Sequence, residues 1–106
     1  MSLRIYSECV AMVRSVGVFV RAIEKRDADL ARQLRRCAAS VVLNCAEGTY
    51  STRGTQRVRF ESALGSAVET RAALEVAEAF GYVDAIDAET RDRLDRIIAT
   101  LWKLTR

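Results

Sequence analysis

The feature that most limits the fold of this chain is the helical spacing of its apolar residues, which continues almost from end to end with no proline to interrupt it. Proline inside a helix removes a hydrogen bond and clashes with the preceding turn, so its absence favours long helices. The spacing predicts helices over residues 3–24, 27–47, 55–80 and 87–104. Because the segments between them are short, consecutive helices should run antiparallel. We therefore expect an all-α fold, an antiparallel up-and-down four-helix bundle.

Four residues are expected to begin or end these helices, and one glycine is expected to allow close packing. Asp27 and Asp87 are predicted N-caps, because a carboxylate can accept a hydrogen bond from a free backbone N–H of the first turn. Gly48 and Gly81 are predicted to end the second and third helices in the left-handed conformation that glycine adopts readily. Gly17 lies inside the first helix, where glycine costs about 1 kcal/mol relative to alanine, which indicates close packing against a neighbour.

The length and composition predict one globular domain. The chain has 106 residues, of which half are hydrophobic and 29% are charged, and a second core would have too little apolar mass. The domain should therefore span residues 1–106. No apolar run approaches the ~18 residues needed to span a membrane, and the apolar stretch at 16–20 is too short for a signal peptide. We expect a cytoplasmic protein with no membrane partner.

The second predicted helix is apolar on two sides. One stripe should face the core of the bundle, and a second strip lies on another side of the helix. The second strip consists of Ala39, Val42, Leu43 and Ala46. A helix that is apolar on two sides must bury both of them. Because a bundle of this size offers few internal partners for the second strip, we expect a homo-oligomer.

The residues that usually carry enzyme chemistry are missing or isolated. The chain contains no histidine, which removes the commonest general base and the commonest transition-metal ligand. Cys9, Cys37 and Cys45 lack C-x-x-C spacing, so neither a disulfide framework nor a zinc site is indicated, and the last two are expected in the core. Glu75 and Glu78 share a helix face that should be a solvated acidic surface. We expect no cofactor, no metal site and no catalytic residue, and hence a protein that is not an enzyme.

Arginine dominates the basic residues and forms two groups. Fifteen of the 17 basic residues are arginine, whose planar guanidinium suits bidentate contacts with phosphate or carboxylate. Two interpretations stay open: a surface that binds nucleic-acid phosphates, or exposed side chains in local ion pairs, such as Arg57 with Glu61. Tyr50 is the aromatic residue placed to stack on a base. The candidate nucleic-acid-binding residues are Arg32, Arg35, Arg36, Tyr50, Arg53, Arg57 and Arg59.

Four polar residues lie beside the apolar stripes of the second and third helices. They are Asn44, Glu47, Ser66 and Glu69. Because an unpaired buried polar group costs about 1–3 kcal/mol, we expect these side chains to meet one another and Arg35 or Arg36. Such a structural polar cluster would set the register of the two helices rather than catalyse a reaction.

Four short motifs resemble those of a known family. They are QLRRCAAS at 33–40, NCAEG at 44–48, GSAVE at 65–69 and FGYV at 80–83. The family comprises bacterial four-helix-bundle proteins encoded in the intervening sequences of 23S ribosomal RNA genes, and it includes the accessory variability protein of diversity-generating retroelements. The resemblance implies a ring-like homopentamer and, from the retroelement member, a basic surface that binds nucleic acid and a reverse transcriptase.

By position, Arg35 and Arg36 match the paired arginines of this family, but two features of the chain differ from its usual pattern. Residues 24–27 replace the aromatic-proline segment that usually joins the first two helices, and Arg71 stands where the family often has an acid. The residues and the resemblance together favour a non-enzymatic, homo-oligomeric accessory protein that binds RNA or DNA. The alternative is an oligomeric scaffold or protein-interaction module with no nucleic-acid role.

Overall fold

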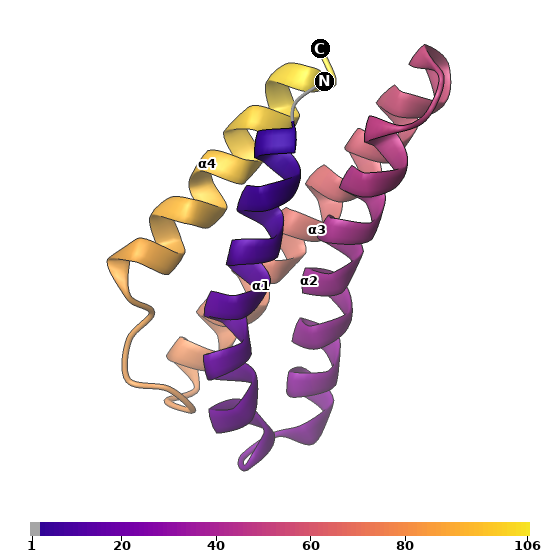
Figure 1. The fold of residues 1–106 in the computed structure, drawn as a ribbon. Coiled ribbons are helices and arrows are strands. Elements are labelled where there is room, and N and C mark those ends of the chain that lie inside the picture. Colours follow the sequence, from indigo (N-terminus) through magenta and orange to yellow (C-terminus); the bar gives the residue numbers. More distant parts are fainter. Residues whose placement is uncertain (1–2) are drawn as a thin grey trace.

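The computed structural model describes residues 3–106 and contains four helices in that part of the chain. They are α1 (Leu3–Glu24), α2 (Ala28–Thr49), α3 (Arg53–Ala79) and α4 (Ala88–Leu104). Each helix packs against the next, and α1 also packs against α4, so the helices stand at the corners of a bundle and run alternately in opposite directions (Figure 1). The predicted all-α four-helix fold is confirmed, and each predicted boundary lies within two residues of the observed one.

Apolar side chains from all four helices meet along the axis of the bundle. Met12 of α1, Phe60 of α3 and Leu94 of α4 are among the largest fully buried side chains. Cys37 and Cys45 of α2 are also buried, as predicted. Burying an aliphatic or aromatic side chain of this size contributes about 1.5–3 kcal/mol, so the helical stripes seen in the sequence are the main source of stability.

The outer faces of the helices carry charged residues, so the helices are amphipathic. Within residues 3–106, no helix combines the length and the apolar character needed to cross a bilayer.

The three helix-related glycine predictions have different outcomes. Gly81 ends α3 with a φ of 76°, as predicted. Gly48 does not end α2: the helix continues to Thr49, and a Cβ at Gly48 would lie 2.6 Å from Cε1 of Phe60. The prediction was wrong because this glycine makes room for a ring of the next helix rather than for a turn. The close contact predicted at Gly17 is also absent, since no other part of residues 3–106 lies within 4 Å of the position of its Cβ.

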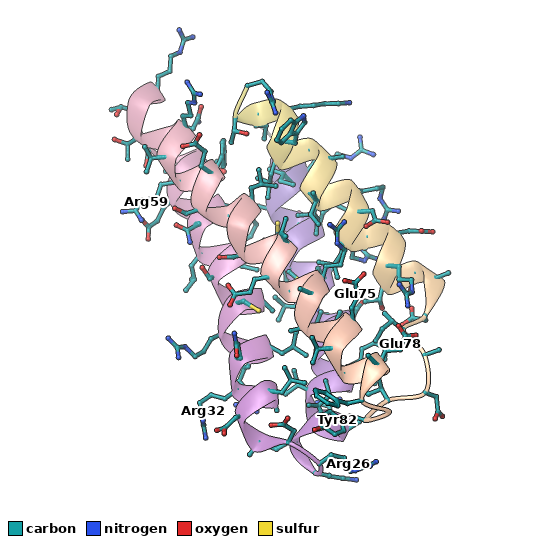
Figure 2. The ribbon with its side chains drawn as sticks, turned by 180° about the vertical axis from the view of Figure 1, so that it is seen from behind. Arg26, Arg32, Arg59, Glu75, Glu78 and Tyr82 are labelled. Carbon is teal, nitrogen blue, oxygen red and sulfur yellow. The ribbon has the colours of Figure 1, made fainter. Side chains whose placement is uncertain are left out.

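The turn between α1 and α2 is tied to the end of α3. Asp27 caps α2 by accepting a hydrogen bond from the backbone N–H of Leu30 at 2.9 Å, as predicted. Its second carboxylate oxygen accepts a hydrogen bond from the hydroxyl of Tyr82 at 3.2 Å, and Arg26 lies over the Tyr82 ring (Figure 2). Tyr82 also stacks on Phe80, with 5.3 Å between the ring centroids. These contacts close one end of the bundle.

Asp87 is the N-cap of α4, again as predicted. Its carboxylate accepts hydrogen bonds from the backbone N–H of Thr90 at 3.0 Å and from the Thr90 hydroxyl at 2.7 Å. The hydroxyl hydrogen bond holds the pKa of the Asp87 carboxyl below its ordinary value of 3.8. The ionised form is therefore favoured in the folded protein.

Replacing Asp87 by alanine should lower the free energy of unfolding by about 1 kcal/mol at neutral pH, the usual contribution of an N-cap. Because folding lowers this pKa, the stabilisation is present above the ordinary aspartate pKa and is lost as the pH falls through the folded value. Urea denaturation of wild type and Asp87→Ala at pH 7 and at successively lower pH should therefore show the difference narrowing. Asp87→Asn, which keeps an acceptor oxygen, should cost less at pH 7. A difference that is constant across this pH range would contradict the prediction.

Candidate nucleic-acid interface

A line of hydrogen bonds joins α2 to α3. The Ser40 and Ser66 hydroxyls lie 2.8 Å apart across the two helices. Asn44, one turn further along α2, donates its amide N–H to the backbone carbonyl and the hydroxyl of Ser40, at 3.0 and 3.1 Å. Ser40 therefore links two residues of the predicted polar cluster, although its own part in the cluster was not predicted.

The two acidic residues of this cluster pair with other partners along the same seam. Glu47 forms an ion pair with Arg59 at 2.9 Å, and Glu69 accepts a hydrogen bond from the side-chain amide of Gln33 at 3.2 Å. All four predicted residues thus lie on the α2–α3 seam and each connects to a neighbour. The neighbours are Ser40, Gln33 and Arg59, so the predicted contacts of the four residues with one another and with Arg35 or Arg36 were wrong.

An open groove with a volume of about 940 Å³ runs along this seam and is called the α2–α3 groove below. Arg36 lines it without an ion pair in the described part of the chain, and Leu43 lines it with 62% of its surface exposed. The groove is therefore mixed in character, with polar side chains between the helices and an exposed aliphatic side chain at its rim.

Most of the candidate arginines already have a carboxylate partner at the surface. Exposed pairs of this kind contribute about 0–1 kcal/mol, so an incoming phosphate can replace the carboxylate at little cost. Arg36 and Arg53 make no ion pair within 4.0 Å among residues 3–106. The pairs are Arg32 with Asp29 (2.9 Å), Arg35 with Glu24 (3.7 Å), Arg57 with Glu61 (3.7 Å) and Arg59 with Glu47 (2.9 Å).

The two groups of candidate arginines lie apart along the α2–α3 groove, which Arg32, Arg36 and Arg59 all line. Arg32 and Arg59 lie toward opposite ends of the α2–α3 side of the bundle (Figure 2). This separation follows from the antiparallel hairpin, because the first group lies near the start of α2 and the second follows its end. A ligand that reaches both groups would lie along the α2–α3 groove.

The connection between α2 and α3 presents an aromatic ring beside arginines. Tyr50 is 82% exposed, and residues 48–60 contain three arginines and no acid. The connection is held by Gln56, whose side-chain amide donates to the backbone carbonyl of Gly48 at 3.0 Å. Tyr50 and Arg53 therefore project from a turn that is tied down by hydrogen bonds.

Three basic residues, two on α1 and one directly after it, were missed as candidates. Arg14, Arg21 and Lys25 are exposed, and none of them makes an ion pair within 4.0 Å among the described residues. The signal in the sequence was the charge balance of residues 1–26, which hold five basic and two acidic side chains. The number of basic and acidic residues in this segment does not reveal which basic side chains lack an ion pair in the folded protein.

Glu75, Glu78 and the cysteines, which were considered as possible catalytic or metal-binding residues, do not gather into a metal-binding site in the described part of the chain. Glu78 pairs with Arg91 at 2.6 Å and accepts a hydrogen bond from the backbone N–H of Ile86, whereas Glu75 is exposed (Figure 2). Cys9 and Cys45 are free thiols in the core whose sulfurs lie 3.5 Å apart, and this hydrogen bond together with burial raises the pKa of Cys9. Within residues 3–106, no three acidic or cysteine side chains gather in a way that could hold a metal ion.

Comparison with known proteins gives one family and one solved structure. A family model described as 23S rRNA-intervening sequence protein matches residues 1–103. A crystal structure of a protein with unknown function from the S23 ribosomal protein family, from Bacteroides thetaiotaomicron VPI-5482, is similar in fold with a TM-score of 0.66. It shares 19% sequence identity, and the match covers 95% of this chain and 91% of that chain. No curated protein matches the chain.

Proposed function

Because the chain belongs to the 23S rRNA-intervening sequence protein family, we propose that it is a non-enzymatic, homo-oligomeric accessory protein that binds nucleic acid. The observation that carries the proposal is the connection between α2 and α3, where an exposed tyrosine stands in a basic segment without acids. Proteins that bind single strands commonly combine aromatic rings, on which bases stack, with cations that contact the phosphates.

Tyr50 and Arg53 provide these two kinds of contact. A tyrosine ring that is 82% exposed offers a face to an unpaired base, and Arg53 offers a guanidinium that pairs with no carboxylate of residues 3–106. Arg57 and Arg59 can add contacts by exchanging their exposed carboxylate partners for phosphates. We propose a nucleic acid with unpaired bases as the ligand, because bases inside a duplex do not present a free face.

The homo-oligomer is proposed from apolar side chains that stay exposed in the single chain. Ala39 and Leu43 of the second apolar strip are exposed on α2, and Val58 of α3 is 58% exposed. Val42 and Ala46, the other members of the strip, are partly buried. Contact between copies would remove Leu43 and its neighbours from water, which is favourable by about 25 cal/mol per Å² of apolar surface.

The same exposed residues support a second candidate, an oligomeric scaffold without a nucleic-acid role. Leu43 could bind a protein partner as well as another copy, and four of the six candidate arginines are satisfied by local ion pairs. This candidate predicts that polyanions do not bind. Nucleic-acid binding therefore separates the two candidates.

The test is fluorescence anisotropy of a labelled single-stranded RNA, a single-stranded DNA and an RNA duplex at low salt. We expect micromolar or tighter binding to a single strand that weakens as salt rises. Tyr50→Ala should weaken it about fivefold to a hundredfold, because stacking on one base contributes about 1–3 kcal/mol. The control is Phe80→Ala, an exposed aromatic at the opposite end of α3, which should change binding little. The absence of binding to all three probes would overturn the proposal.

A further inference from the structure

The outer face of α1 is a basic surface that the candidate residues do not include. Arg14, Val18 and Arg21 follow one another at steps of four and three residues, so they lie on one side of the helix, and Lys25 is the first residue after its end. All four are exposed. Because these side chains are exposed, this face points away from the core of the bundle, and Figure 1 shows α1 crossing in front of α3.

The acids closest in sequence to these cations are already engaged. Residues 9–23 contain no acid. Glu8, before this segment, pairs with Arg93 at 3.2 Å and Arg96 at 3.7 Å on α4, and Glu24, after it, pairs with Arg35 on α2. The fold therefore directs the flanking acids toward neighbouring helices and leaves the cations of the outer face uncompensated.

These cations contribute little to the fold itself. Arg21 lies in the last turn of α1 and Lys25 directly follows the helix, so the two like charges are close together and do not stabilise each other. Both lie near the carboxyl end of α1, where the helix dipole favours a cation, but Arg14 is in the middle of the helix and gains nothing from the dipole. The helix dipole therefore accounts for two of the three cations, and it leaves the charge of Arg14 without a stabilising role.

The basic surface continues from α1 onto α2. Arg21 and Arg35 both line a shallow groove of about 220 Å³ between the two helices. The other residues that line this groove are Val13, Val16, Gly17, Val20 and Ala38, none of which is charged. Arg35 is one of the candidate nucleic-acid-binding residues, so the α1 face adjoins the first group of candidate arginines.

We propose that the outer face of α1 binds the sugar–phosphate backbone of the nucleic acid, an inference that rests on the proposed function. Arg14 and Arg21 are separated by about 10 Å along the helix axis, and Lys25 follows at the start of the turn, so three cations can contact separate phosphates of one extended strand. Contacts of this kind position the ligand and do not read its sequence. Arg32, Arg35 and Arg36, which are exposed near the start of α2, can contact further phosphates of the same strand.

The test compares two variants that each remove three positive charges. The first is the triple substitution Arg14→Gln, Arg21→Gln and Lys25→Gln. It should weaken binding of the labelled single-stranded RNA about tenfold or more at low salt, to a similar extent for unrelated sequences. The slope of the logarithm of the binding constant against the logarithm of salt concentration should fall by about 2–3, because each phosphate contact contributes about 0.7–0.9.

The control is the triple substitution Arg71→Gln, Arg91→Gln and Arg96→Gln. These side chains are paired with Asp95, Glu78 and Glu8 on the α3 and α4 sides of the bundle. Circular dichroism should show that both variants are folded. The control should change the affinity and the salt slope much less than the α1 variant does.

Each outcome decides one of the two proposals. If wild type binds RNA and the two variants have the same effect on binding, the proposal that the α1 face contacts the backbone is overturned, while the proposed function stands. If polyglutamate displaces the labelled RNA from wild type as effectively as unlabelled RNA does, the face recognises an acidic protein and the inference is overturned. If wild type binds none of the nucleic-acid probes, the proposed function is overturned and the inference falls with it.

Discussion

Replacing Gly48 by leucine is expected to lower the free energy of unfolding by about 3 kcal/mol or more, at the upper end of the effects of overpacking. A Cβ at this position would lie 2.6 Å from Cε1, 2.8 Å from Cδ1 and 3.2 Å from Cζ of Phe60. Phe60 is only 1% exposed, so its ring is confined by the core on its other sides. The smaller change Gly48→Ala should lose about 1–2 kcal/mol, because the clash outweighs the helical preference of alanine.

The matched control for this prediction is Gly65→Ala. Gly65 also lies inside a helix, but nothing lies within 4 Å of the position of its Cβ. This substitution should raise the free energy of unfolding by up to about 1 kcal/mol, since only the helical preference changes. Urea denaturation followed by circular dichroism, at one protein concentration for all variants, measures the difference. Equal stability of Gly48→Ala and Gly65→Ala would show that the Phe60 ring moves aside freely.

The combination Gly48→Ala with Phe60→Leu tests the cause directly. If the clash with the ring is responsible, the smaller side chain at position 60 should make Gly48→Ala less costly than it is in wild type. Because the two residues are in contact, their effects should not add. Additive losses would mean that Gly48→Ala acts through something other than Phe60.

The second large effect is expected at Leu43, whose replacement by lysine should dissociate the proposed homo-oligomer. Leu43 is 62% exposed in the single chain, so the substitution should leave the helix and the core intact. Burying an ammonium group in a contact between copies is unfavourable, and the loss of an anchoring apolar residue typically costs about 2–4 kcal/mol. The dissociation constant should therefore rise about thirtyfold to a thousandfold.

Size-exclusion chromatography with light scattering measures this result against a monomer mass of 11.8 kDa. Val68→Lys is the control, because Val68 is 41% exposed on α3 but does not line the α2–α3 groove. It should leave the wild-type mass unchanged. A wild-type protein that is monomeric would contradict the proposed oligomer, and an unchanged mass for Leu43→Lys would remove Leu43 from the contact.

The seam between α2 and α3 could be predicted only in part. Asn44, Glu47, Ser66 and Glu69 all lie on it, because helical spacing places each residue on a known side of its own helix. Their partners were not predicted, because pairing across helices depends on the axial offset of one helix against the other. Ser40, for example, could not be assigned to Ser66 before that offset was known.

The ion pairs of the arginines could also be predicted only within a helix and not between helices. The pair of Arg57 with Glu61 was named in one of the two open interpretations, because both residues lie one turn apart on one helix. The contact of Glu8 with Arg93 joins residues 85 positions apart and was not predicted. It is this contact, with that of Glu24 and Arg35, that leaves the cations of α1 without an acid. The basic face of α1 is therefore visible only in the folded chain.

The sequence by itself determined the number of helices, their approximate ends and the side of each that is buried. Those properties depend on spacing, capping and turn chemistry within a few residues, which are local. The tertiary structure alone decided which charges are neutralised, which polar groups meet and why Gly48 must be glycine. These depend on distances between helices, and a change of one turn in how two helices pack would reassign every such partner while leaving the helices unchanged.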